Sequence, residues 1–201
     1  MPVPAPSQAA PIATILRSPE VQAISFTFGA ATILPADFRD VAQKIDDGNI
    51  TIVMDRTRLT SMKAEAEYDS GTNVLSLKWP VQPASAYSAG NAVHEAVHAA
   101  LDNKGVSLPL REDEGAAHVA QVWYLANRGE SIDRTPDPLR SAVTALRAQV
   151  AGGTSPAVLP LADVTAVKAQ IGVFGYRDIT AIKDGISLRS PVRPRGPCMP
   201  I

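Results

Sequence analysis

The sequence predicts a single α+β domain, in which one helix precedes a small antiparallel or mixed sheet and further packed helices follow it. Two observations predict this order. Five segments space apolar residues at helical intervals, and the region between residues 50 and 79 instead alternates or carries runs of β-branched residues. The chain has 201 residues, of which 45% are hydrophobic, so it is long enough for a core that needs no disulfide bonds.

The first helix is expected at residues 35–45. Pro35 suits the first turn of a helix, and apolar residues recur at helical intervals from Phe38 to Ile45. The segment 47–49, Asp-Gly-Asn, is a typical stop signal.

Three short strands are expected next, at residues 50–54, 63–69 and 73–79. The last two are separated by Asp-Ser-Gly-Thr at residues 69–72, a turn sequence that predicts a hairpin.

The rest of the domain is expected to be helical, at residues 89–103, 111–127, 138–150 and 161–171. A loop at 152–156, rich in glycine and ending in proline, separates the last two helices. These last two helices carry no motif, so we assign them to the scaffold and the wall of a cleft.

Both ends of the chain are rich in proline. Residues 1–11 and residues 190–201 are expected to form a flexible arm and a flexible tail around a single folded domain at 12–189. Cys198 is the single cysteine, so it can form no disulfide within the chain and is expected to be a surface thiol.

The net charge of −1 gives no electrostatic reason to expect nucleic acid or an anionic membrane as a partner. The sequence has no apolar run of the roughly 20 residues that a membrane span needs, and no basic, apolar leader at its start. These features favour a cytoplasmic protein, although a protein exported without a signal peptide would look the same. The oligomeric state is left open.

The segment His94-Glu95-Ala96-Val97-His98 is the most informative motif. Residues four apart share one face of a helix, so two neutral imidazoles can bind the same Zn²⁺, with the intervening carboxylate beside a zinc-coordinated water. Two structural histidines on a packed helix are the alternative. That alternative fits poorly, because each buried ring would need its own hydrogen-bond partners.

The motif, together with the small sheet before it and the helix after it, resembles the zincin metallopeptidases over about residues 50–127. The resemblance implies a zinc-dependent hydrolase that cleaves a protein or peptide, with His94 and His98 as metal ligands and Glu95 as the general base. The extended branch of the family, HExxHxxGxxH, is excluded because Leu101 and Lys104 stand where it needs glycine and histidine.

In the gluzincin branch the third ligand is a glutamate on the following helix, which here begins with Arg-Glu-Asp-Glu-Gly-Ala-Ala-His. We choose Glu114, because the small residues 115–117 after it would let this helix approach the HExxH helix closely. Glu112 and Asp113 are the alternatives. Acidic residues here could instead offset the helix dipole.

His118 lies four residues after Glu114 and is expected on the same helix face. It could orient a ligand carboxylate, stabilise an oxyanion, replace Glu114 as third ligand, or only support the packing of the two helices. Asp102, four residues after His98, could accept the proton on the second nitrogen of a ligand histidine or cap the helix end.

By analogy with zincins, the strand at 73–79 could align an extended peptide by strand addition. It could equally be an ordinary hairpin strand over the core. The hydroxyl groups of Tyr68, Tyr87 and Tyr124 could hydrogen-bond a reaction intermediate, but these residues are more simply core or rim residues. The two tryptophans, Trp79 and Trp123, are expected to be packing residues.

The sequence thus leaves three hypotheses. The first is a zinc metallopeptidase, including small cytoplasmic enzymes that cleave repressors and toxins delivered to neighbouring cells. The second is a zincin-like binding or regulatory protein without catalysis. The third is a metal-free interaction domain in which the HExxH motif is structural.

Overall fold

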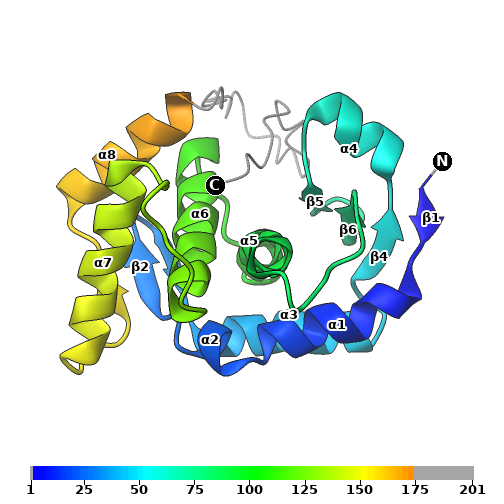
Figure 1. Ribbon diagram of the computed structural model, residues 1–201, viewed down its shortest axis with the longest axis horizontal. Coiled ribbons are helices and arrows are strands. Elements are labelled where there is room, and N and C mark those ends of the chain that lie inside the picture. The colour runs from blue at the N-terminus through cyan, green and yellow to red at the C-terminus, as the bar shows by residue number, and fades with distance from the viewer. Residues whose placement is uncertain (1, 174–201) are drawn as a thin grey trace.

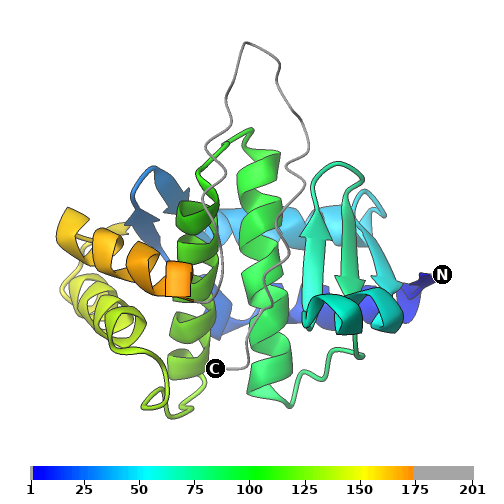
Figure 2. The ribbon, with the colours of Figure 1, turned by 90° about the horizontal axis from the view of Figure 1, so that it is seen from above.

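Helix α5, Ala86–Asn103, runs through the middle of the molecule, with other elements on both sides of it (Figures 1 and 2). The computed structural model describes residues 2–173. One side carries a four-stranded sheet, and the other carries α6, Leu110–Asn127, backed by α7, Asp137–Ala151, and α8, Leu161–Val173. The described residues therefore form the α+β class that the sequence predicts.

The four-stranded sheet has the order β1-β4-β6-β5. β4, Thr51–Met54, pairs in parallel with β6, Val74–Leu77, whereas β5, Ala66–Asp69, pairs antiparallel with β6. The predicted hairpin and mixed sheet are therefore confirmed. Because β6 is bonded to a strand on each side, the segment 73–79 has no open edge for a peptide, and the strand-addition analogy was wrong for this strand. The edge strand beside α5 is β5 (Figure 1).

A second sheet has the order β3-β2-β7 and was not expected. β2, Phe26–Phe28, pairs antiparallel with β3, Ala31–Ile33, and in parallel with β7, Ala157–Val158. Strands of two or three residues are too short to show a period in the sequence. Among the described residues, no helix is both long enough and apolar enough to cross a membrane.

The predicted helices are confirmed within a few residues, and the first of them is α3, Pro35–Asp46. Helix α4, Arg56–Met62, was not expected and takes the place of a loop. It begins where the Asp55 side chain accepts a hydrogen bond from the amide of Arg58, and it ends at Lys63, whose φ is 57°. The strand predicted from residue 63 therefore starts three residues later.

The first eleven residues do not form the flexible arm that their prolines predicted. β1, Val3–Pro4, pairs with β4, and a short 3₁₀ turn at Pro6–Gln8 leads into α1, Ala9–Leu16, which packs against α3. α2, Pro19–Gln22, follows. Prolines at an edge strand and in the first turn of a helix are compatible with order, so this prediction was wrong. The predicted tail, Cys198 and residues 174–189 lie outside the described residues.

Helices α5 and α6 pack closely, and Gly90 lies at their contact. A Cβ atom on Gly90 would lie 3.4 Å from Gln121 Cγ, and both helices bury several alanines. Gly115, which we expected to serve this purpose, faces the other way, because a Cβ there would lie 2.7 Å from the ring of Phe28. The reason for choosing Glu114 was therefore wrong for Gly115, although Glu114 itself meets the histidines.

Candidate metal centre

Four buried side chains from α5 and α6 meet between the two helices. α5 places His94 and His98 one turn apart, and α6 places Glu114 and His118 one turn apart. Each of the four is less than 5% exposed. Burial of four ionisable side chains costs free energy unless the groups are paired or bind a metal. Their convergence therefore indicates pairing or a metal site.

Two of the three separations among His94, His98 and Glu114 match the edge of a tetrahedral zinc site. His94 Nε2 lies 3.2 Å from His98 Nε2 and 3.3 Å from Glu114 Oε2, and His98 Nε2 lies 3.8 Å from Glu114 Oε1. Ligand atoms bound at 2.0–2.1 Å to a tetrahedral ion lie about 3.3 Å apart. The donor set, two imidazoles and one carboxylate, is also one that zinc commonly takes. The residues therefore fit the ion that the sequence predicted.

Asp113 is hydrogen-bonded to the nitrogen of His98 that faces away from His94 and Glu114. Its Oδ1 lies 2.7 Å from His98 Nδ1, so the ring donates a hydrogen bond to the carboxylate through its Nδ1–H group. A neutral imidazole has one N–H, and Nε2 is therefore left as a lone pair that faces His94 and Glu114. A carboxylate behind a histidine is the usual partner of a zinc-binding imidazole.

The two alternative third ligands are placed elsewhere. Glu112 Oε1 accepts a hydrogen bond from the amide of Ala30 at 2.7 Å, and its Oε2 from Lys168 Nζ at 2.9 Å. Burial opposes ionisation of Glu112, but these two donors outweigh it and lower the pKa of its carboxyl group. Asp113 is bound to the far side of the His98 ring. Glu114 is thus the residue of the acidic trio that meets both histidines.

His118 lies against His94, with ring centroids 4.6 Å apart. Its Nδ1 is 3.2 Å from Gln121 Oε1, an atom that can only accept, so the proton is on Nδ1 and Nε2 carries the lone pair. Burial first, and the nearby His94 second, lower the pKa of His118 to about 3, which keeps the ring neutral. A ligand atom of His118 also lies within 4.8 Å of ligand atoms of His94 and Glu114.

This tautomer bears on the roles considered for His118. A lone pair on Nε2 suits a metal ligand or a proton acceptor, whereas stabilising an oxyanion would need a proton there. Two overlapping groups of donors therefore share His94 and Glu114, one completed by His98 and the other by His118. We base the zinc site on the group with His98, because His94 Nε2 lies close to the length of a tetrahedral edge from both His98 Nε2 and Glu114 Oε2.

Glu95 is 2% exposed and points toward the edge strand of the four-stranded sheet. Its Oε2 accepts a hydrogen bond of 2.7 Å from the amide of Tyr68 in β5. This contact joins the carboxylate of the HExxH motif to the edge strand beside α5, so Glu95 is not a solvated residue on the helix surface.

Asp102 does not support a ligand histidine. Its Oδ2 lies 2.9 Å from the hydroxyl of Tyr68, which is also 2.8 Å from Asn73 Oδ1. Tyr68 is fully buried, and this bond links the end of α5 to the hairpin. The role that we considered for Asp102 is taken by Asp113.

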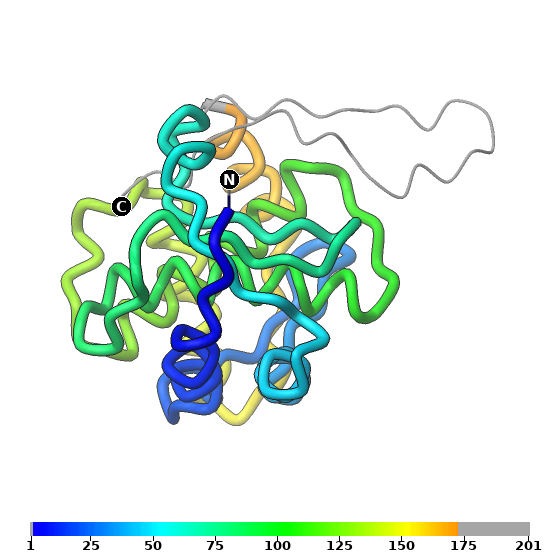
Figure 3. Tube along the Cα trace, turned by 90° about the vertical axis from the view of Figure 1, so that its right-hand side faces the viewer, coloured from blue at the N-terminus to red at the C-terminus, as the bar shows by residue number. Residues whose placement is uncertain are grey.

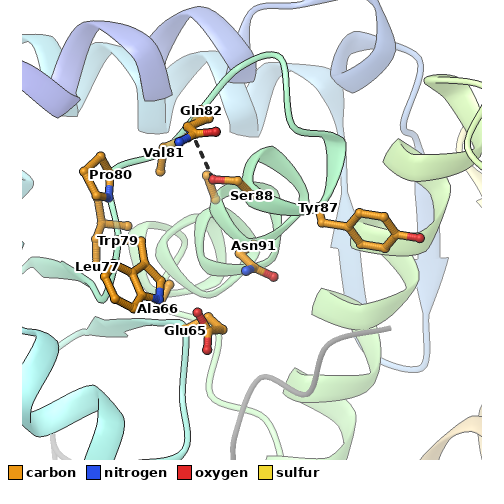
Figure 4. Close-up of a pocket in the computed structure, with 11 residues that line it drawn as sticks. Glu65, Ala66, Leu77, Trp79, Pro80, Val81, Gln82, Tyr87, Ser88 and Asn91 are labelled. Carbon is orange, nitrogen blue, oxygen red and sulfur yellow. Dashed lines mark hydrogen bonds between the residues drawn. The ribbon is translucent and has the colours of Figure 1, made fainter.

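A cleft of about 340 Å³ opens near the first turns of α5 (Figure 4). It is lined by the segment 79–82, by Glu65, Ala66 and Leu77 of the hairpin region, and by the helix residues Tyr87, Ser88, Asn91 and Ala92. Trp79, expected to be a packing residue, is 47% exposed here, whereas Trp123 is buried and stacks on Phe26 at 6.0 Å. The packing prediction is thus confirmed for Trp123 and wrong for Trp79.

Sequence reasoning missed two polar residues that support the centre. Gln121 binds His118 and donates through Nε2 to Asn91 Oδ1 at 2.9 Å, which connects the centre with the cleft. A glutamine three residues after His118 on a helix is the one signal that was present in the sequence. The contact with Asn91 joins two helices and leaves no local pattern.

Comparisons with protein-family models, with curated proteins and with solved structures find no match for this chain.

Proposed function

We propose that the protein is a zinc-dependent hydrolase of the zincin type, similar to gluzincins, and that its reaction is the hydrolysis of a peptide bond. His94, His98 and Glu114 are the proposed ligands. The observation that carries the proposal is the convergence of donor atoms from α5 and α6. His94 Nε2 lies 3.2 Å from His98 Nε2 and 3.3 Å from Glu114 Oε2, and His98 Nε2 lies 3.8 Å from Glu114 Oε1. The tautomer of His98 supports it, because Asp113 leaves the Nε2 lone pair facing His94 and Glu114.

When bound, zinc supplies Lewis acidity that lowers the pKa of water to about 7 and polarises a carbonyl group. Glu95 then accepts the proton of the attacking water at its carboxylate and delivers it to the leaving amine. The amide of Tyr68 holds one oxygen of Glu95 in place, so the carboxylate keeps its orientation during both transfers. Asp113 keeps His98 in the ligating tautomer throughout.

The choice of a peptide as substrate rests on the resemblance to zincins, since the same centre could hydrolyse other amides or esters. The position of the edge strand β5 agrees with this choice, because Glu95 is bound to it. The proposed partner is therefore a protein or peptide substrate.

Metal content is the first test. The full chain, purified without a histidine tag, is analysed for zinc beside His98→Ala and Glu114→Gln. Glu112→Gln is the matched control, since it changes a second buried glutamate of α6 that points at Ala30 and Lys168. Thermal unfolding of each variant checks that it is folded.

We expect about one zinc per chain in the wild type and in Glu112→Gln, and little in the other two variants. Zinc that persists in Glu114→Gln would contradict Glu114 as a ligand and move the third position to His118. A wild type that binds no zinc after addition of the ion would contradict the proposal and favour a metal-free interaction domain.

One observation favours a second candidate, a zincin-like binding protein without catalysis. A ligand atom of His118 lies within 4.8 Å of those of His94 and Glu114, so His118 could take the fourth position at the ion. A site with four protein ligands has no open position for water and is typical of structural zinc. The absorption spectrum of the cobalt-substituted protein distinguishes the two: an inhibitor with a hydroxamate group alters the spectrum only if a position is open.

A further inference from the structure

The cleft beside α5 differs from the metal centre in its walls. Its apolar lining comes from Ala66, Leu77, Trp79, Val81 and Ala92, and its polar groups are few. Two of these already have partners in the protein. Glu65 is paired with Lys78 at 2.8 Å, and the main-chain N–H of Gln82 donates to Ser88 Oγ at 3.1 Å (Figure 4). A largely apolar cavity with few polar groups is the usual form of a site for an apolar group of a ligand.

Trp79 forms the exposed apolar wall of the cleft. The guanidinium of Arg56, which is not a lining residue, lies 3.9 Å from the centre of the indole ring and covers it. The residue remains 47% exposed although its side chain is large and apolar. In Figure 4 it lies beside Ala66 and Leu77, whereas Tyr87 points away from it, so Trp79 and not Tyr87 forms the aromatic wall of the cleft.

Asn91 connects this cleft with the metal centre. Because Gln121 donates to Asn91 Oδ1, the amide nitrogen of Asn91 is turned the other way, and Figure 4 shows it on the side of Trp79. Gln121 also binds His118, so the cleft and the centre share a chain of hydrogen bonds. The N–H groups of Asn91 can thus donate to a carbonyl of an occupant in the cleft.

The position of Asn91 along the helix sets the distance between the two sites. Asn91 precedes His94 by three residues and Glu95 by four, which is about 4.5–6 Å along the axis of α5. One or two residues of an extended peptide span that distance, at about 3.3 Å each. A peptide that reached both sites would therefore place the side chain in the cleft within one or two residues of the bond that is cleaved.

We propose that this cleft binds a large apolar side chain of the peptide substrate, such as that of phenylalanine, and that Trp79 and Asn91 determine this specificity. The inference rests on the proposed function for the assignment of the occupant as a substrate. Trp79 packs against the side chain, and Asn91 donates to the adjacent main-chain carbonyl. Burial of a phenylalanine side chain predicts a preference of about tenfold or more over alanine.

Binding is measured on the full chain carrying Glu95→Gln, so that the probe stays intact. The probes are two capped hexapeptides, acetyl-Ala-Ala-Phe-Ala-Ala-Ala-amide and its all-alanine analogue, titrated while the indole N–H signals of the two tryptophans are followed by NMR. We expect the phenylalanine probe to shift the signal of Trp79 and to bind at least tenfold more tightly than the alanine probe.

Two variants test whether the cleft causes the preference for the phenylalanine probe. Trp79→Ala, with calorimetric titration as the readout, should reduce affinity for the phenylalanine probe to that for the alanine probe. Leu161→Ala is the matched control, because it removes a 78% exposed apolar side chain outside the cleft. Equal affinities for the two probes, or an unchanged affinity in Trp79→Ala, would overturn the inference.

Zinc content and cleavage by the wild type separate this inference from the proposed function. Cleavage with bound zinc but without a preference for phenylalanine would overturn the inference alone. Binding of the phenylalanine probe at Trp79 in a protein that neither holds zinc nor cleaves would support the cleft as a peptide site and contradict the hydrolase. With both correct, Trp79→Ala lowers kcat/KM for the phenylalanine probe about tenfold at unchanged zinc content.

Discussion

Asp113 Oδ1 lies 2.7 Å from His98 Nδ1, on the side of the ring away from His94 and Glu114. This contact fixes the tautomer of His98 and adds negative charge behind the ring, and both effects make Nε2 a better ligand. The contact joins α5 to α6, and its two residues are fifteen positions apart in the sequence, so no local pattern predicts it.

Asp113→Asn should weaken zinc binding by about 10- to 100-fold, because the ring loses a charged partner but keeps a hydrogen-bond acceptor. The dissociation constant is measured by competition with a chromogenic chelator. Asp163→Asn, on α8, is the control and should leave the affinity unchanged. An unaltered affinity in Asp113→Asn would show that this carboxylate does not support a ligand.

Glu95→Gln should retain zinc and lose peptide cleavage by about 100-fold or more, since glutamine can accept the hydrogen bond from Tyr68 but cannot take up a proton. Zinc content and the rate of cleavage of the phenylalanine hexapeptide are measured on the same preparation. Glu67→Gln, which alters a neighbouring carboxylate that is paired with Arg58, should cleave normally. Full activity in Glu95→Gln would remove Glu95 as the base.

His118 should make the zinc-free protein sensitive to acid. Burial and the neighbouring His94 lower its pKa to about 3 from an ordinary value of 6.5, so below pH 6.5 the unfolded chain binds a proton that the folded chain excludes. The free energy of unfolding should therefore fall between pH 6.5 and 3 by up to about 1.4 kcal/mol per pH unit from this group. Above pH 6.5 the group contributes no pH dependence.

Urea unfolding of the wild type and of His118→Gln, each treated with a chelator, measures this contribution at pH 7.5, 5.5 and 4.5. Glutamine cannot be protonated, so the variant should lose less stability on acidification than the wild type. Parallel pH profiles for the two proteins would contradict the depressed pKa of His118.

The elements that were predicted correctly are those whose pattern lies within one segment. Residues 35–46, the hairpin strands and the helices from α5 onward each carry their own period and stop signals, and a histidine pair four apart defines its own geometry on a helix. Residues 1–11 were misjudged because their prolines were interpreted as a sign of flexibility, although proline is compatible with the edge strand β1 and with the 3₁₀ turn at Pro6–Gln8.

The parts of the centre that were missed depend on contacts between elements. Glu112, Asp113 and Glu114 are equivalent in the sequence, and only the packing of α6 decides that the first meets Ala30, the second His98 and the third the histidine pair. The chain from His118 through Gln121 to Asn91 likewise exists only when α5 and α6 are docked. Local periodicity contains no information on these pairings.

Gly115 and Gly90 test that docking directly, because both lie in buried helix and differ in what a new Cβ atom would meet. In Gly115→Ala the atom would lie 2.7 Å from the Phe28 ring, so β2 or α6 must shift, and the free energy of unfolding should fall by about 1–3 kcal/mol. In Gly90→Ala the nearest atom is a flexible side-chain carbon at 3.4 Å, and the gain in helix propensity offsets the tighter contact. Urea unfolding should therefore rank Gly115→Ala well below Gly90→Ala, and the reverse order would contradict the orientation of α6 that brings Glu114 to the histidines.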